Sequence, residues 1–369
     1  MRFLSIVWYQ VLPSRFGGQK GIALFNKYLS AHEPLDCLCS KNNKPPDDIT
    51  YKVIAELPNS KTQFFNPFCW KKIVDTARKQ HSTHLILEHP YHGIAGFLVK
   101  TILKRKLIVH SHNIEYLRFK QLKKWWWKIL QVYEGWTHRQ ADLSIFKTEA
   151  DLERAVAQFK LQKTKCFVIP YGIEQTIDPR IRIAARKEME QFYDIAPHEK
   201  ILLFAGTLDY LPNAEAVEAI YTIIAPGLSE KNISFKIIIC GRNRFPEFSY
   251  LNELSQPNVI NAGEIEEIEK YFAAADVFIN PVIITTGIQT KVIDALSFHC
   301  NVVCFENMIT DIPLELLHEK IFMAPLNDWS AFIEQTIKGA KSFTQTPDGF
   351  MNKLHWDNLA KEFIAAIND

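Results

Sequence analysis

The sequence predicts an α/β protein with two doubly wound domains, each built on a parallel sheet that helices cover on both faces. Three observations lead to this prediction. Short, almost wholly apolar runs alternate with helical segments along most of the chain, as expected for parallel strands buried on both faces. The alternation starts a second time near the middle of the chain. The length of 369 residues is enough for two domains of ordinary size.

The first series of elements occupies 1–175, which we expect to form one domain. Its short apolar runs predict buried strands at 3–7, 35–39, 84–87, 107–110, 143–146 and 166–169. Helical patterns occur at 21–29 and 92–103, and one long helix is expected over 115–140. The stretch 41–48 is expected to be irregular.

The second series occupies 176–348 and is expected to form the second domain. It begins with a charged segment, 178–200, which we interpret as a solvated connection. Strands are predicted at 201–206, 236–240, 259–260, 277–280 and 302–305. Helices are predicted at 214–224, 265–275, 291–298 and 329–339. The last segment, 349–369, is an amphipathic helix with no strand after it.

Composition excludes several classes of protein. With 47% hydrophobic and 23% charged residues, the chain is not dominantly disordered. A formal net charge of +2 argues against a dedicated nucleic-acid binder. The apolar N-terminus lacks a small-residue cleavage site and predicts a buried first strand, and no run approaches the ~18 apolar residues of a membrane span. Seven cysteines without a Cys-x-x-Cys pair favour reduced, buried thiols in the cytoplasm.

Each domain has a glycine-containing polar turn after its first strand, where the carboxyl edge of a parallel sheet binds ligands. In the first domain this turn contains Gly17 and Gly18, and the helix that follows would attract an anion with its N-terminus. The alternative is a flexible first loop with no ligand. Two adjacent glycines do not decide between them.

The strongest local pattern is the segment 285–296, in which a loop leads through Gly287 into a helix. Backbone N–H groups, the hydroxyl of Thr290 and the ammonium of Lys291 would converge there on a doubly charged phosphate. Asp294 lies one turn further along and would reach a ribose hydroxyl. The alternative is an ordinary helix start that a threonine caps.

Several segments, taken in order, resemble the retaining glycosyltransferases of the GT-B fold in the large group called family 4. Similar motifs follow one another along nearly the whole chain, at 17–18, 111–115, 141–148, 206–214, 287–294 and Trp356. The segment 206–214 is similar to the family's "G-S-x-D-x-x-P-N" loop, and 287–294 resembles its "G-x-x-x-K-x-x-E" donor site. Trp356 matches the helix that crosses back onto the first domain.

The resemblance implies a nucleoside-diphosphate sugar in the second domain, a glycan or lipid-linked acceptor in the first, and a reaction between them. It implies retention at the anomeric carbon and, together with the missing Asp-x-Asp pair, no metal; the nucleotide sugar is a substrate and no cofactor is expected. His112 is the expected catalytic residue, near the transferred sugar. The expected donor-binding residues are Gly17, Gly18, Gly206, Arg242, Gly287, Ile288, Thr290, Lys291 and Asp294.

Two features depart from the family pattern. The usual paired E-x7-E is replaced by Thr286 and Asp294, and the loop 206–213 carries no arginine or lysine. The diphosphate charge would then be met by Lys291, the helix dipole, and Arg242 or Arg244. A member that has lost its activity remains the alternative.

His110 and His112 follow a strand and allow a second interpretation. Alternate residues at a strand end share one face, and such a pair ligates zinc in metal hydrolases. That interpretation needs further ligands at later strand ends, which the second-domain strands do not supply, so no metal is expected. A structural role is the third alternative for His112.

Residues 115–139 combine basic side chains with three consecutive tryptophans, 125–127. Five cations lie there without an intervening acid up to Glu134: Arg118, Lys120, Lys123, Lys124 and Lys128. This pattern favours peripheral contact with an anionic membrane. Because successive helical residues are about 100° apart, three tryptophans cannot all face one core. The alternative is that two pack inward and one is exposed.

We expect a cytoplasmic enzyme of cell-surface glycan assembly, peripheral on the inner face of a membrane. A nucleotide-sugar epimerase of the same two-domain plan is the main rival, for which Glu88 is the obvious acid/base candidate. A catalytically silent carbohydrate- or lipid-carrier-binding protein is the rival from another class.

Overall fold

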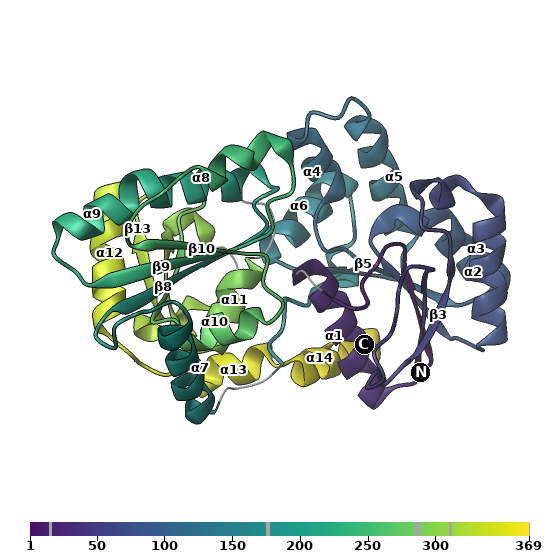
Figure 1. The fold of residues 1–369 in the computed structure, drawn as a ribbon. Helices are drawn as coiled ribbons and strands as arrows, with labels where there is room; N and C mark the ends of the chain where they lie inside the picture. Colours follow the sequence, from purple (N-terminus) through teal and green to yellow (C-terminus); the bar gives the residue numbers. More distant parts are fainter. Residues whose placement is uncertain (15–16, 175–177, 285–288, 310–311, 369) are drawn as a thin grey trace. The chain divides into compact units, whose positions relative to one another are not determined.

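The structure, a computed structural model, describes residues 1–14, 17–174, 178–284, 289–309 and 312–368. The chain divides into two compact units (Figure 1). The first unit contains the chain up to Glu174 and the C-terminal segment from Leu354. The second contains the described residues from 178 to Lys353. The chain therefore leaves the first unit after Glu174 and returns to it at Leu354.

The described part of the first unit is built on a seven-stranded sheet in which all neighbouring strands are parallel, in the order β3-β2-β1-β4-β5-β6-β7. Its strands are β1 (Phe3–Val7), β2 (Leu35–Ser40), β3 (Lys52–Leu57), β4 (His84–Glu88), β5 (Lys106–His110), β6 (Leu143–Phe146) and β7 (Cys166–Val168). The strand order reverses between β1 and β4. Ligands of doubly wound sheets bind beyond the carboxyl ends of strands at such a point.

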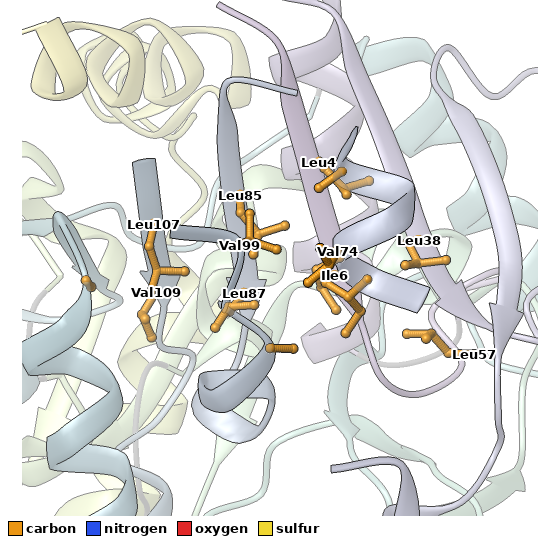
Figure 2. Close-up of a cluster of buried hydrophobic side chains, with 14 residues drawn as sticks. Leu4, Ile6, Leu38, Leu57, Val74, Leu85, Leu87, Val99, Leu107 and Val109 are labelled. Carbon is orange, nitrogen blue, oxygen red and sulfur yellow. The ribbon is translucent and has the colours of Figure 1, made fainter. Parts of the chain in front are cut away.

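Helices α2 (Pro67–Lys79) and α3 (Gly93–Leu103) cover one face of this sheet. Because side chains alternate between the two faces of a strand, Leu4 and Ile6 of β1 point to this side. They pack with Val74 of α2 and Val99 of α3 in a core of buried aliphatic side chains (Figure 2). Asn66 starts α2 by accepting a hydrogen bond from the N–H of Phe68, and Pro67 occupies the first turn.

The opposite face of the sheet is covered by α1 (Gly17–His32) and α14 (Trp356–Asn368). Phe363 of α14 packs against Phe25 of α1 and Phe3 of β1, with ring centroids 5.1 and 5.8 Å away. Each of these buried phenyl rings contributes roughly 1.5–3 kcal/mol. The C-terminal helix is thus part of the first unit's core, which confirms the prediction that the helix carrying Trp356 returns to the first domain.

The remaining helices of the first unit pack over β6 and β7. They are α4 (Glu115–Gln121), α5 (Trp127–Gln140) and α6 (Glu149–Phe159), with short 3₁₀ turns at Lys61–Phe65, Pro90–His92 and Lys163–Lys165. Phe146 of β6 and Phe159 of α6 are fully buried in their core. Thr148 caps α6 by accepting a hydrogen bond from the N–H of Asp151.

In the described part of the second unit, a six-stranded parallel sheet repeats the plan of the first, in the order β10-β9-β8-β11-β12-β13. Its strands are β8 (Lys200–Ala205), β9 (Phe235–Cys240), β10 (Val259–Gly263), β11 (Val277–Asn280), β12 (Asn301–Phe305) and β13 (Ile321–Ala324). The strand order reverses between β8 and β11. The second ligand-binding edge of a doubly wound sheet is therefore expected beyond these two strands.

The second unit contains the following α-helices: α7 (Pro179–Phe192), α8 (Leu211–Ala219), α9 (Ala225–Glu230), α10 (Ile268–Ala274), α11 (Thr290–Ser297), α12 (Trp329–Lys341) and α13 (Asp348–Leu354). A π-helical turn, Ile220–Ile224, joins α8 to α9, and short 3₁₀ turns lie at Pro246–Asn252, Glu306–Met308, Leu314–Leu316 and His318–Lys320. Asp328 caps α12 through the N–H of Ala331.

Two predicted helices are wrong in extent. The long helix expected over 115–140 is two helices, because Lys123 takes the left-handed conformation (φ 53°) and ends the first of them. The C-terminal helix is also interrupted, at His355. There the N–H of Trp356 donates to the carbonyl of Ile173, and the N–H of Ile173 donates to the carbonyl of Leu354.

The segment 178–200 is not a solvated connection, as the sequence suggested. Asp178 caps α7 through the N–H of Arg180, and Pro179 lies in the first turn. Arg186 pairs with Asp276 at 2.6 Å, and Met189 is buried. The charges thus hold the helix against its unit. The prediction also lacked β3, α2, α6 and β13.

All seven cysteines are buried and free, as predicted. Within the described ranges, no helix combines the length and apolar character that crossing a bilayer requires.

Candidate functional site

The second unit places a lysine ammonium beside a glycine at the point where its strand order reverses. Gly206 follows β8, and Lys291 lies in the first turn of α11, which follows β11. A Cβ atom added at Gly206 would collide with the Lys291 ammonium and with the Asn213 amide. A side chain at position 206 would therefore displace the ammonium from its present place. The two predicted residues thus lie together at the carboxyl edge of the sheet, where doubly wound folds have their ligand-binding crevice.

The Lys291 ammonium is poorly compensated. Its hydrogen bond among the described residues goes to Oδ1 of Asn213 at 3.1 Å, and Asn213 Nδ2 donates in turn to the carbonyl of Thr207 at 2.8 Å. No carboxylate of the described chain pairs with it. Burial lowers the pKa of Lys291 to about 8. A cation held this way gains from a bound anion, which would supply the missing charge.

Asp209, in the loop after β8, organises the neighbouring loop after β9. Its carboxylate accepts from Nε of Arg242 at 2.8 Å and from the N–H groups of Arg244 and Phe245 at 2.6 and 2.8 Å. The Arg244 guanidinium pairs with Glu264. Arg242 is therefore held at the same carboxyl edge, while Arg244 is engaged elsewhere.

The other predicted donor-binding residues lie as follows. Thr290 begins α11, and Asp294 follows one turn later on the same helix; both are half-buried. No acidic residue occupies the first turn of α11, and Gln289 gives no side-chain cap there. Gly287 and Ile288 lie outside the described residues.

Gly17 and Gly18 begin α1 in the first unit, with Gly18 close to the hydroxyl of Tyr9. They belong to the first unit, whereas Gly206 and Lys291 belong to the second. They lie after β1, at the equivalent edge of the other sheet.

That edge of the first unit carries a buried cluster of histidines around one carboxylate. The pairing of β4 with β5 sets Glu88 opposite His110, and His112 follows two residues later. His112 Nε2 lies 2.7 Å from Oε2 of Glu88, and His110 Nδ1 lies 3.0 Å from the same oxygen. Glu88 and His110 are fully buried, while 9% of the His112 side chain is exposed. Both histidines thus contact one carboxylate, which lies at the end of the neighbouring strand β4.

The charged groups of this cluster are the Glu88 carboxylate and the ammonium of Lys147, which follows β6. Burial would raise the pKa of Glu88, but its contacts with His110 and His112 hold it well below its usual value. Burial holds the pKa of His112 well below its usual value. Burial also lowers the pKa of Lys147 to about 8, partly offset by Glu88. The arrangement near pH 7 is an ionised carboxylate, neutral imidazoles and a mostly protonated lysine.

Glu88, His110 and His112 also offer three ligand atoms within 4.8 Å of one another, so the metal interpretation of the histidine pair gains a carboxylate. Two observations favour proton sharing instead. The contact of 2.7 Å between Glu88 and His112 is a hydrogen-bond distance. Lys147 already interacts electrostatically with Glu88 and would repel a divalent cation.

Three residues at these two sheet edges were not predicted from the sequence. Asn213 and Asp209 lie in the loop motif that carried the resemblance, but their hydrogen bonds depend on loops elsewhere in the chain. Lys147 ends the motif 141–148, where its apolar neighbours gave no sign of a charge buried between Phe25 and Trp356. The motif residues next to them in sequence were the one signal that could have indicated these three residues.

Two family profiles match the chain, one in each half. Residues 29–176 match the family described as Glycosyltransferase Family 4, and residues 199–341 match the family described as Glycosyl transferases group 1. The two matches leave only the chain ends and the segment 177–198 uncovered. No curated protein is close enough in sequence to count as a relative.

Solved structures of similar fold cover the whole chain at low identity. Sucrose-phosphate synthase from Thermosynechococcus elongatus has a TM-score of 0.75 at 14% identity, over 100% of this chain and 98% of its own. The HepE protein of Anabaena, solved with UDP and glucose, has a TM-score of 0.72 at 15% identity, over 100% of both chains. The lipopolysaccharide outer core galactosyltransferase WaaB has a TM-score of 0.65 at 11% identity, over 99% of both chains. These likenesses establish a GT-B-like fold.

Proposed function

Because the chain belongs to the glycosyltransferases of group 1 and family 4, which use nucleotide sugars, we propose that it transfers a sugar, with retention and without a metal, to a glycan or lipid-linked acceptor. The donor is a nucleoside-diphosphate sugar bound at the crevice of the second unit. His112 of the first unit acts on the transferred sugar. The setting is cell-surface polysaccharide or glycolipid assembly.

The observation that carries the proposal is the Lys291 ammonium against Gly206. It has a neutral amide partner and no carboxylate among the described residues, and it lies at the N-terminus of a helix. A diphosphate would receive a charged hydrogen bond from Lys291 and favourable interaction with the helix dipole. This supports stabilisation of the leaving diphosphate by the protein itself, with Thr290, Arg242 and the segment containing Gly287 and Ile288 adding to it.

Calorimetric titration with UDP and GDP tests the donor site. Lys291→Ala removes a charged contact worth roughly 1.5–3 kcal/mol, so the dissociation constant rises about 10- to 100-fold. Lys270→Ala is the matched control, because this exposed lysine pairs with Glu267 and Glu188 on the surface of the same unit. Unchanged nucleotide binding in Lys291→Ala, with the parent binding normally, would remove the proposed donor site.

The identity of donor and acceptor is proposed from the similar structures. HepE was solved with UDP-glucose as well as with UDP and glucose. WaaB is described as a lipopolysaccharide outer core galactosyltransferase. UDP-sugars are therefore the first donors to screen, and glycolipid or oligosaccharide acceptors the first partners.

Glu88, the candidate acid/base residue of the epimerase alternative, does not suit that role. An epimerase of this plan needs an acid/base carboxylate that faces the sugar. Glu88 is 1% exposed, and its carboxylate is occupied by His110 and His112. The burial of Glu88 favours transfer over epimerisation.

We further propose that the first unit binds an anionic membrane through residues 115–139, the α4–α5 region (Figure 1). Trp126 packs on Phe119 and Trp127 on Tyr116, while Trp125 is 83% exposed. Two tryptophans thus support the fold and one faces outward. Four apolar side chains there are half or more exposed, namely Leu122, Trp125, Ile129 and Val132.

Cations surround this exposed apolar group. Lys120 and Lys128 approach the Trp127 ring to 5.0 and 5.6 Å, and Lys123 and Lys124 occupy the turn between the helices. Basic residues are attracted to anionic lipid by about 1 kcal/mol each, and an exposed tryptophan favours the interface. Peripheral binding of this kind would bring a lipid-linked acceptor to the enzyme.

A further inference from the structure

His112 contacts Glu88 through one specific ring nitrogen. The distance of 2.7 Å joins His112 Nε2 to Oε2 of Glu88. An ionised carboxylate can only accept, so the hydrogen in this contact must lie on Nε2. The lone pair of the neutral ring is then on Nδ1, on the other side of the imidazole. Across the described residues, no hydrogen-bond partner approaches Nδ1.

The carboxylate of Glu88 is itself fixed. Ser5 Oγ lies 3.5 Å from Oε1, at the limit of a hydrogen bond, and Asn26 Nδ2 of α1 donates to Ser5 Oγ at 3.3 Å. Glu88 is the last residue of β4 and is buried. Its orientation is therefore set by the sheet and by α1, not by a flexible loop.

The ring of His112 is also held from its sides. The His110 ring lies 4.4 Å away and the His89 ring 4.8 Å away, measured between centroids. His89 has φ 79° and ψ 156°, a backbone conformation that is unfavourable for a non-glycine residue. Its N–H donates to the carbonyl of His110 at 3.0 Å, and its Nδ1 lies 3.1 Å from Glu115. Strained backbone that the surroundings hold in place is typical of functional sites.

We propose that Glu88 is a positioning residue that holds His112 as the Nε2–H tautomer, so that Nδ1 accepts a hydrogen bond from a hydroxyl group of the bound sugar. This inference rests on the proposed function. It assigns His112 an acceptor role and gives the buried carboxylate a task in transfer that needs no contact with substrate. It also replaces the acid/base role that an epimerase would require of Glu88.

The charged and titratable groups facing this pair come from every neighbouring element. His89 follows β4, His110 ends β5, Lys147 follows β6, and Tyr9 follows β1. Lys147 favours the ionised carboxylate, while burial disfavours protonation of His112. The cluster therefore keeps the acceptor form of His112 at neutral pH.

Glu88→Gln tests the proposal by steady-state kinetics across pH. With a UDP-sugar and an acceptor that the parent uses, kcat is expected to fall roughly 10- to 100-fold, the range found when a group that orients a histidine ligand is removed. KM for the donor should change less than about threefold, because donor phosphates bind elsewhere. Loss of the anion disfavours imidazolium, so the acidic limb of kcat/KM moves to lower pH. A structural defect alone would lower activity equally at all pH values.

Asp36→Asn is the matched control. Asp36 is a buried carboxylate of the same sheet that pairs with Arg2 at 3.0 Å, and no hydrogen bond or ion pair joins it to a histidine of the described chain. The acidic limb of kcat/KM in Asp36→Asn should coincide with that of the parent. If Glu88→Gln keeps the parent's kcat and acidic limb, the positioning role is wrong. If the parent itself transfers no sugar, the proposed function fails instead.

A second measurement reads the tautomer of His112 in the parent protein itself. Nitrogen-15 NMR of the histidine rings in the parent reports the tautomer directly, with His112→Gln identifying the His112 signals. We expect hydrogen on Nε2 and a non-protonated Nδ1 at pH 7.5. Hydrogen on Nδ1, or a doubly protonated ring at that pH, would overturn the proposal.

Discussion

The two units use the same sheet plan and fill the equivalent edge differently. In the first unit, the edge beyond β1 and β4 holds a carboxylate, Glu88, that two histidines contact, with Lys147 buried nearby. In the second unit, the edge beyond β8 and β11 holds the Lys291 ammonium with a neutral amide partner. One charge is compensated within the protein and the other is not, so far as the described residues go.

This difference indicates two kinds of chemistry on one scaffold. An ammonium without a carboxylate partner suits a multiply charged ligand such as a diphosphate. A neutral imidazole fixed by a buried carboxylate suits the hydroxyl groups of an uncharged sugar. The position of each crevice follows from topology, whereas its specificity follows from the residues at the strand ends.

Removing the imidazole of the first crevice should give the largest effect. His112→Ala is expected to lower kcat about 10²- to 10⁴-fold, the range for a residue that assists proton movement or charge development. KM for the donor should change little, since Lys291 is unaltered. Steady-state kinetics on the folded variant checks this. A variant with normal specific activity per folded molecule would return His112 to a structural role.

A second difference is the basic surface of α4 and α5 in the first unit. Changing Lys120, Lys123, Lys124 and Lys128 to Gln removes attraction on the order of 4 kcal/mol before screening. Flotation with anionic vesicles should then recover far less protein, and salt should weaken binding by the parent. Equal recovery with neutral and anionic vesicles would leave the tryptophan run as core packing alone.

The second crevice predicts a pH dependence of nucleotide binding. Lys291 has a pKa of about 8, so below pH 8 it is mostly charged and affinity for UDP should be nearly constant. Above pH 8 the free protein loses this proton, and affinity should fall up to about tenfold per pH unit. Calorimetry in two buffers at pH 8.5 measures the protons exchanged on binding. We expect proton uptake, because bound UDP favours the charged form of Lys291. In Lys291→Ala this uptake should vanish, and its persistence there would assign the proton to another group.

The smallest effect concerns the residue that orients the lysine. Asn213→Ala removes the amide between Lys291 and the carbonyl of Thr207. A typical hydrogen bond contributes about 1 kcal/mol net, so UDP should bind about fivefold more weakly. The same titration checks it. An effect as large as that of Lys291→Ala would mean that Asn213 itself binds the ligand.

Much of the fold was predictable from the sequence because central parallel strands are buried on both faces. The strand Phe3–Val7 is buried along its whole length, and its apolar run is visible in the sequence. The strand Lys52–Leu57 lies at the sheet edge with most side chains partly exposed, so its sequence carries no such run. The helix Pro179–Phe192 was missed because Arg182 and Arg186 bind groups distant in sequence.

The candidate sites were predictable only in part. Lys291 and His112 stand in recognisable motifs, and both lie at the expected sheet edges. The contact of Glu88 with His110 and His112 depends on the register of β4 against β5, which no local pattern encodes. Asn213 reaches Lys291 across 78 positions of sequence. Such pairings emerge only when the strands are assembled.

Acceptor-dependent release of nucleoside diphosphate from a nucleotide sugar tests the central claim most directly. A panel of UDP-, GDP- and ADP-sugars is incubated with glycolipid and oligosaccharide acceptors in the presence of EDTA. We expect nucleoside diphosphate in equal amount to the glycosylated acceptor, with release reduced in both Lys291→Ala and His112→Ala. Conversion of the sugar without release, or no release with any donor and acceptor, would contradict it.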